Sequence, residues 1–147
     1  MTGVQTCALP ISSLLLREGE IEKAREAVNY MPTTPRYHRD LLESCLGLRP
    51  PEEADRMAHD AETNAPAAPD AEFLYYQGAI FADCGKRQAA LRLLSAAIGQ
   101  NYCAYSNLLL DPMLRKVRLA PGFNDLLKSA KECRDAAVSS KNEPPTP

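Results

Sequence analysis

One arrangement of small and apolar residues recurs three times along the chain. A turn residue is followed after five positions by alanine and then by two apolar residues at helical spacing. The frame starts at Gly19, Arg49 and Gly85, so its starts lie 30 and 36 residues apart. Its apolar members are Ala24, Val28 and Met31, then Ala54, Ala58 and Ala61, then Ala90, Leu94 and Ala97. Because a small turn residue lets one helix fold back on another and alanine lets their backbones approach closely, the pattern predicts stacked pairs of antiparallel helices.

The rest of the sequence also favours helices. Helix-forming residues dominate, β-branched residues are sparse, and short breaks rich in proline, glycine or asparagine separate segments of helical periodicity. We expect helices over residues 12–18, 21–31, 36–46, 49–64, 71–84, 87–100, 111–117 and 121–136. The predicted fold class is therefore all-α.

The last unit, residues 71–104, carries its key residues in a specific order. Leu74, Gly78 and Phe81 mark its first helix, Gly85 its turn, and Ala90, Leu94 and Ala97 its second helix. This order resembles the tetratricopeptide repeat, a helix–turn–helix unit of about 34 residues. The match is weaker at Tyr102, where the family has proline, and in the middle unit, where Leu42 replaces the first-helix glycine. The resemblance covers roughly residues 12–104 and implies a short right-handed solenoid.

The segment after the last unit has a motif of its own. Its members are Asp111, Pro112, Leu114, Val117, Arg118, Pro121, Phe123, Leu126 and Leu127. The motif resembles the end of repeat-bearing tails of bacterial serine/threonine kinases and winged-helix regulators. In physical terms, residues 105–137 are predicted to form a helical cap over the open end of the last repeat, as a solenoid requires. Residues 138–147 are expected to be a disordered tail.

The first eleven residues, MTGVQTCALPI, carry no charged side chain and follow neither a helical nor a strand period. Read back into codons, they resemble a translated sequencing-library adapter. We therefore exclude residues 1–11 from the fold and expect the natural protein to continue upstream of Ser12. The alternative is a genuine disordered N-terminus. In a fragment of this kind the apolar stripe from Ile21 to Met31 would be partly uncovered, which predicts self-association through the first repeat.

Charge and hydropathy exclude some classes of partner. The formal net charge is −2, which gives no general attraction to nucleic acid or to an anionic membrane. No apolar run approaches the ~18 residues of a membrane span. The cytoplasm is the default compartment, and a span upstream would instead place the repeats outside the cell.

The cysteines offer no metal site. Cys45, Cys84, Cys103 and Cys133 lie beyond residue 11, and their spacings match no metal-binding pattern. Cys84 and Cys103 flank one predicted helix and so lie about 20 Å apart, whereas a disulfide needs Cα atoms within about 7 Å. We therefore expect reduced, mostly buried thiols.

One triplet is shared with catalytic machinery. His38, Arg39 and Asp40 copy the catalytic-loop triplet of protein kinases, but Cys45 and Leu42 stand where that loop needs asparagine and lysine. The glycine-rich loop and the DFG motif of kinases are missing from the sequence. No catalytic, cofactor-binding or metal-binding residue is therefore predicted, and this fragment is not expected to be an enzyme.

A partner-binding surface is implied by the repeat resemblance. In that family the first helix of each unit lines the concave face. The outward positions are Arg36, Arg39 and Glu43 in the middle unit and Glu72, Tyr75, Ala79 and Asp83 in the last. Tyr75 and Ala79 replace the polar clamps that grip a peptide carboxylate, so a chaperone-tail binder is not expected. The alternative is that this face packs on upstream repeats.

The function predicted from these features is a protein–protein interaction or scaffold module that binds a protein or peptide. Two alternatives come from the cap motif. The fragment would then be the regulatory tail of a bacterial serine/threonine kinase or of a winged-helix transcription regulator.

Overall fold

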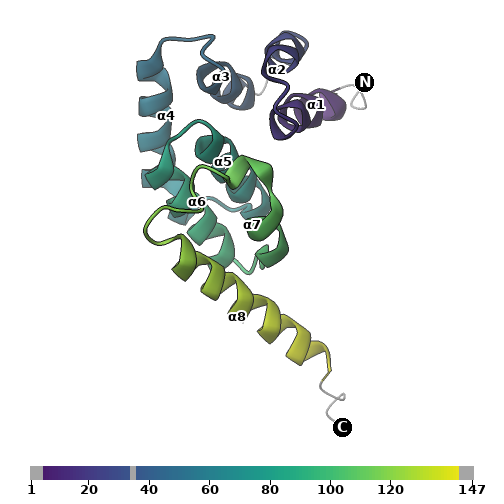
Figure 1. Ribbon diagram of the computed structural model, residues 1–147, viewed down its shortest axis with the longest axis vertical. Helices are drawn as coiled ribbons and strands as arrows, with labels where there is room; N and C mark the ends of the chain where they lie inside the picture. Colours follow the sequence, from purple (N-terminus) through teal and green to yellow (C-terminus); the bar gives the residue numbers. More distant parts are fainter. Residues whose placement is uncertain (1–4, 34–35, 143–147) are drawn as a thin grey trace.

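The computed structural model describes residues 5–33 and 36–142, with side chains from residue 11 onward, and every regular element in these ranges is helical (Figure 1). The elements are α1 (Gln5–Arg17), α2 (Ile21–Val28), α3 (Arg36–Cys45), α4 (Pro51–Asn64), the 3₁₀ turn η1 (Ala65–Ala67), α5 (Ala71–Asp83), α6 (Arg87–Gly99), α7 (Tyr105–Leu110), the 3₁₀ turn η2 (Pro112–Leu114) and α8 (Phe123–Lys141). The all-α fold class is confirmed.

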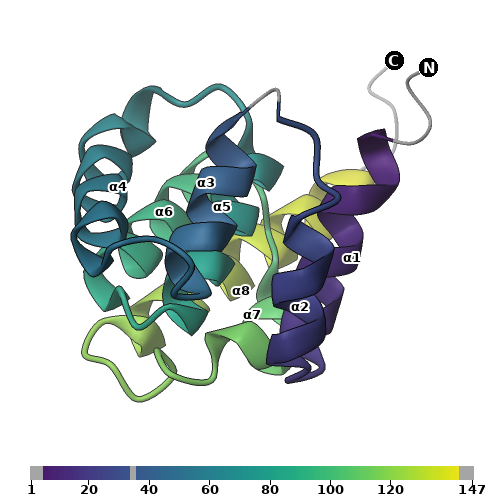
Figure 2. The same ribbon diagram turned by 90° about the horizontal axis from the view of Figure 1, so that it is seen from above.

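The helices pack largely in chain order. Helix α1 packs on α2, α3 on α4 and α5 on α6, and these pairs meet through contacts of α2 with α3, α3 with α5, and α4 with α6. Figure 2 shows α3 and α5 in the middle of the molecule, with α4 on one side and α1 on the other. The final helix α8 packs on α6 and α7 and then extends away from the body (Figure 1).

Three turns reverse the chain at a glycine with the same backbone conformation. Gly19, Gly47 and Gly85 have φ angles of +78°, +73° and +80°, in the left-handed region that favours glycine. After each glycine, the next backbone amide donates to a carbonyl five residues earlier, at 2.8 or 2.9 Å. The middle turn is therefore at Gly47, two residues before Arg49, which the sequence frame had assigned to this turn.

The recurring apolar frame faces the core. Its nine members after the turns are all buried, with exposed fractions from 0 to 8%: Ala24, Val28, Met31, Ala54, Ala58, Ala61, Ala90, Leu94 and Ala97. At Gly78, a Cβ would lie 3.0 Å from Cγ of Leu94 and 3.3 Å from the carbonyl oxygen of Ala90. The close approach of α5 and α6 therefore depends on small residues, as the frame predicts.

The C-terminal segment closes the last helix pair. The Asp111 carboxylate accepts a hydrogen bond from the Met113 amide and so caps η2. Phe123, Leu126 and Ala130 of α8 are buried. Helix α8 continues to Lys141, beyond residue 137, where the sequence placed the end of the cap, and residues 143–147 of the expected tail lie outside the described residues.

The first helix differs from its sequence prediction. Helix α1 begins at Gln5 and so includes part of the segment read as adapter, while residues 1–4 lie outside the described residues. Among the described side chains, Ile11 is half exposed and burial begins at Ser12. The stripe expected to be uncovered on α2 is buried, because α1 is long enough to pack along it. Only Ile21, at the start of that stripe, remains partly exposed.

The cysteines also differ from their prediction. Cys45 is bonded to Cys84 and Cys103 to Cys133, with Cα–Cα distances of 5.1 and 5.3 Å. The first bridge joins the end of α3 to the end of α5, and the second joins the loop after α6 to α8. The prediction of reduced thiols is wrong because packing brings together segments that are distant in sequence. Cys84 and Cys103 do not bond to each other, in agreement with the helix that separates them.

Candidate functional site

The seven residues predicted to share one concave face are divided in the structure. Tyr75 and Ala79 were placed outward by the repeat frame, but they are only 6% and 0% exposed. The reason is that η2 and its flanking residues pack over this side of α5. Asp83, at the end of the same helix, is half buried, and its backbone carbonyl accepts a hydrogen bond from Lys116. The chain's own C-terminal segment therefore covers Tyr75 and Ala79 of the face that was predicted to be concave, while Glu72 remains exposed.

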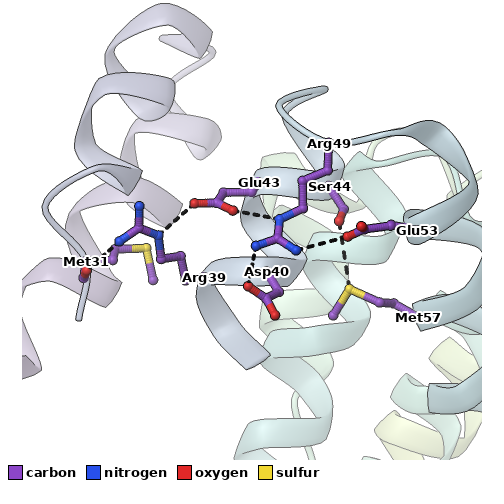
Figure 3. A network of polar contacts seen from close by, with 8 residues as sticks. All are labelled: Met31, Arg39, Asp40, Glu43, Ser44, Arg49, Glu53 and Met57. Atoms are coloured by element: carbon purple, nitrogen blue, oxygen red, sulfur yellow. Dashed lines mark hydrogen bonds and ion pairs between the residues drawn. The ribbon is translucent and has the colours of Figure 1, made fainter. Parts of the chain in front are cut away.

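Two of the middle-unit residues belong to a network of ion pairs (Figure 3). Arg39 Nε lies 2.6 Å from Glu43 Oε1, and Glu43 Oε2 lies 2.7 Å from Arg49 Nε. Arg49 also contacts Asp40 at 2.7 Å and Glu53 at 3.0 Å. Burial alone would raise the pKa of Glu43, but hydrogen bonds from Arg39 and Arg49 hold it below its usual value.

This network has a structural role at the junction of the first two helix pairs. The second guanidinium nitrogen of Arg39 donates to the carbonyl oxygen of Met31, beyond the end of α2, at 3.2 Å. Because their charges are already matched by neighbours, Arg39 and Glu43 have little to offer a partner. The third predicted residue of the middle unit, Arg36, is exposed at the start of α3.

A different surface gathers aromatic side chains from several helices. Two adjoining hollows of about 400 and 410 Å³ lie between α1, α3, α5 and the α7–η2 segment, and they share Arg17, Glu72 and Tyr76. One hollow adds Tyr75 and Tyr102 to these residues, and the other adds His38 and Phe73. These seven residues define what we call the aromatic groove. Of the seven predicted site residues, Glu72 and Tyr75 line it.

The rings of the groove are packed against one another. The His38 ring meets Phe73 edge-on at a centroid distance of 4.8 Å and Tyr76 at 5.8 Å. Tyr75 and Tyr102 lie 5.5 Å apart by the same measure. These separations fall in the range favoured by aromatic pairs, so the rings hold the wall of the groove in place.

His38 is an unusual member of this wall. Its Nδ1 atom is buried and meets no hydrogen-bond partner among the described residues. Burial lowers the pKa of His38, which favours the neutral imidazole. The side chain therefore acts as an aromatic packing group at neutral pH.

The floor of the groove is organised around Asp111. Its carboxylate accepts hydrogen bonds from the Tyr75 hydroxyl at 3.1 Å and from Arg17 Nε and Nη2 at 3.2 and 3.3 Å. Burial raises the pKa of Tyr75, and the Asp111 charge acts in the same direction. One carboxylate therefore connects α1, α5 and η2 and fixes the distance between the walls.

Most of the groove was not predicted from the sequence. Phe73 and Tyr76 were not among the predicted site residues, and Asp111 was placed only in the motif of the C-terminal cap. Arg17 and Tyr102 carried no signal, because nothing in the chain order shows that α1 and the loop after α6 border the same hollow.

Comparison with known proteins gives no relative from which a role can be carried over. No protein-family model, no curated protein and no solved structure matches this chain. Within the described ranges, no helix combines the length and the apolar character needed to cross a membrane.

Proposed function

We propose that this chain is a protein–protein interaction module that binds an extended segment of a partner protein in the aromatic groove. The observation that carries the proposal is the assembly of aromatic side chains from α3, α5 and the loop after α6 around two open hollows. Partner surfaces are rich in tyrosine and other aromatic residues, because a rigid ring buries much area at low entropic cost.

The architecture supports this proposal. Helix pairs that follow one another in chain order, each reversed at a left-handed glycine, are what a short right-handed solenoid of the tetratricopeptide type would show. In such an array the first helices of the units line one surface. Here α1, α3 and α5 all contribute to the groove, so a partner segment would cross several units.

The two disulfide bridges favour an oxidising compartment for this module. All four cysteines beyond residue 11 are paired, and disulfides form and persist in oxidising environments. We therefore place the module in an oxidising, extracytoplasmic setting rather than in the default cytoplasm.

The experiment that tests the function is a selection of random dodecapeptides displayed on phage against the purified, oxidised protein. We expect peptides to be enriched, and the binding of the best of them, measured by fluorescence anisotropy, to weaken about tenfold or more in Phe73→Ala. Tyr102→Ala is a second groove variant, in case Phe73→Ala unfolds. Circular dichroism checks that both variants keep their helical content.

The matched control is Leu119→Ala, because Leu119 is 97% exposed and lies outside the groove. It should leave the affinity unchanged. If no peptide is enriched, or if the selected peptides bind both folded groove variants as tightly as the unaltered protein, the proposal is wrong.

A further inference from the structure

The charges that border the aromatic groove are unbalanced. Among the described residues that line its two hollows, the carboxylates are Asp70, Glu72 and Asp111, and the one guanidinium is that of Arg17. Arg17 is already matched, because its Nε lies 3.2 Å from Asp111 Oδ1 and the same group donates to Oδ2. Two acidic side chains are therefore left over on the rim.

Glu72 is the best placed of the two acids. It is exposed in the first turn of α5 and borders both hollows, whereas the Asp70 carboxylate is already used to cap α5 through the Phe73 amide. Glu72 lines the same hollow as Tyr76 and Tyr102. Burial raises the pKa of Tyr102, and the charge of Glu72 adds to that rise, so the negative charge acts on this ring.

An exposed carboxylate beside tyrosine rings is a combination that suits a cation. The ring faces attract a guanidinium or an ammonium group through their quadrupole, and the carboxylate supplies the counter-charge. The chain already contains such a contact elsewhere, since the Arg134 guanidinium lies 4.5 Å from the centroid of the Tyr105 ring.

From this arrangement we infer that the partner segment inserts a basic side chain, arginine or lysine, between Glu72 and the rings of Tyr76 and Tyr102. The inference rests on the proposed function and specifies the chemistry of its partner. An acidic segment is disfavoured, because it would meet Glu72 and Asp70 while the Arg17 charge is already engaged.

The test compares two charge reversals in the full chain. Glu72→Lys changes the groove, and Glu52→Lys is its matched control. Glu52 is also an exposed acid at the second position of a helix, and it lies outside the groove. Both variants lose the same favourable interaction with a helix N-terminus, so any difference between them belongs to the groove.

Random dodecapeptides selected on the unaltered protein should be enriched in arginine or lysine within an apolar context. Their affinity should fall about tenfold in Glu72→Lys and stay within about twofold in Glu52→Lys. Replacing the basic residue of a selected peptide by norleucine should reproduce the loss. A second selection on Glu72→Lys itself should lose the basic preference.

Two outcomes separate this inference from the proposed function. The inference is overturned if the enriched peptides lack basic residues, or if they bind Glu72→Lys and Glu52→Lys equally. The proposed function still stands in either case if the binding is weakened by Phe73→Ala. The absence of any enriched peptide overturns both.

Discussion

At the scale of single residues, a few polar contacts decide how the groove is held. The buried carboxylate of Asp111 joins three segments, and the neutral ring of His38 packs against α5. A charged or polar group in such a position stabilises the fold only while its partners stay in place.

Replacing Tyr75 with phenylalanine removes the hydroxyl that donates to Asp111 and keeps the ring. A hydrogen bond to a charged acceptor contributes about 1.5–3 kcal/mol, so the free energy of unfolding should fall by that amount. Urea denaturation measures the change. The same substitution at Tyr30, which is 85% exposed, should have almost no effect. Equal stabilities of the two variants would show that the Tyr75–Asp111 contact does not support the fold.

The lowered pKa of His38 predicts how the stability of the protein depends on pH. Because its folded-state pKa lies below the ordinary value of 6.5, the unfolded chain takes up a proton first as the pH falls. Stability should therefore be full above that value and decrease as the pH falls from it toward the lower folded-state pKa. Thermal unfolding measured across this window follows the loss.

His38→Gln is the variant for this test, since glutamine does not titrate. The slope of the melting temperature against pH should flatten in it. The lowered pKa of Glu43 also makes stability fall with decreasing pH, but in more acidic solution than for His38. The raised pKa of Asp83 has the opposite effect on stability in that acidic range. A slope unchanged by His38→Gln would mean that the imidazole titrates normally in the folded protein.

At the scale of the elements, close helix packing depends on the small residues of the recurring frame. Ala90 is fully buried on α6, and its carbonyl oxygen lies 3.3 Å from where a Cβ at Gly78 would stand. Larger side chains at this contact would have to push α5 and α6 apart. Interiors are packed too closely to absorb such a change without cost.

Ala90→Leu should therefore destabilise the protein by about 1–3 kcal/mol through overpacking. The comparison is Gln88→Leu, two positions earlier on the exposed side of α6, where a change within about 0.5 kcal/mol is expected. Chemical denaturation of both variants gives the two values. If leucine were tolerated equally at both positions, the proposed register of α6 against α5 would be incorrect.

At the scale of the whole molecule, the two disulfides connect parts of the chain that are distant in sequence. One bridge spans 39 residues and the other 30. The first joins the ends of α3 and α5, and the second joins the loop after α6 to α8. They therefore restrict the unfolded chain and hold neighbouring helices together.

Reduction should lower the free energy of unfolding by about 2–4 kcal/mol for each bridge. Thermal melts with and without reductant measure the effect of both bridges. The double variant Cys45→Ser, Cys84→Ser removes the first bridge alone and so measures its separate contribution. Mass spectrometry of peptides from the unreduced protein should find the Cys45–Cys84 and Cys103–Cys133 pairs. Free thiols at all four of these cysteines, together with melts that do not respond to reductant, would contradict the pairing.

The sequence by itself determined the local structure. Most helix positions and the buried frame depend on contacts within about one turn of helix, so periodicity and residue type were enough to predict them. The exceptions are α7, which was not expected, and residues 111–117, where the 3₁₀ turn η2 forms in place of the expected helix. The core positions of Ala24, Ala54 and Ala90 were predicted for the same reason.

Only the tertiary structure decided the surface. Tyr75 is exposed in the repeat frame and buried in the molecule, because the segment around Asp111 folds over it. The same kind of long-range contact paired Cys45 with Cys84 and brought Arg17 to the groove formed by Tyr76 and Tyr102. These contacts join residues dozens of positions apart, and a pattern that repeats every few residues carries no information about which of them meet.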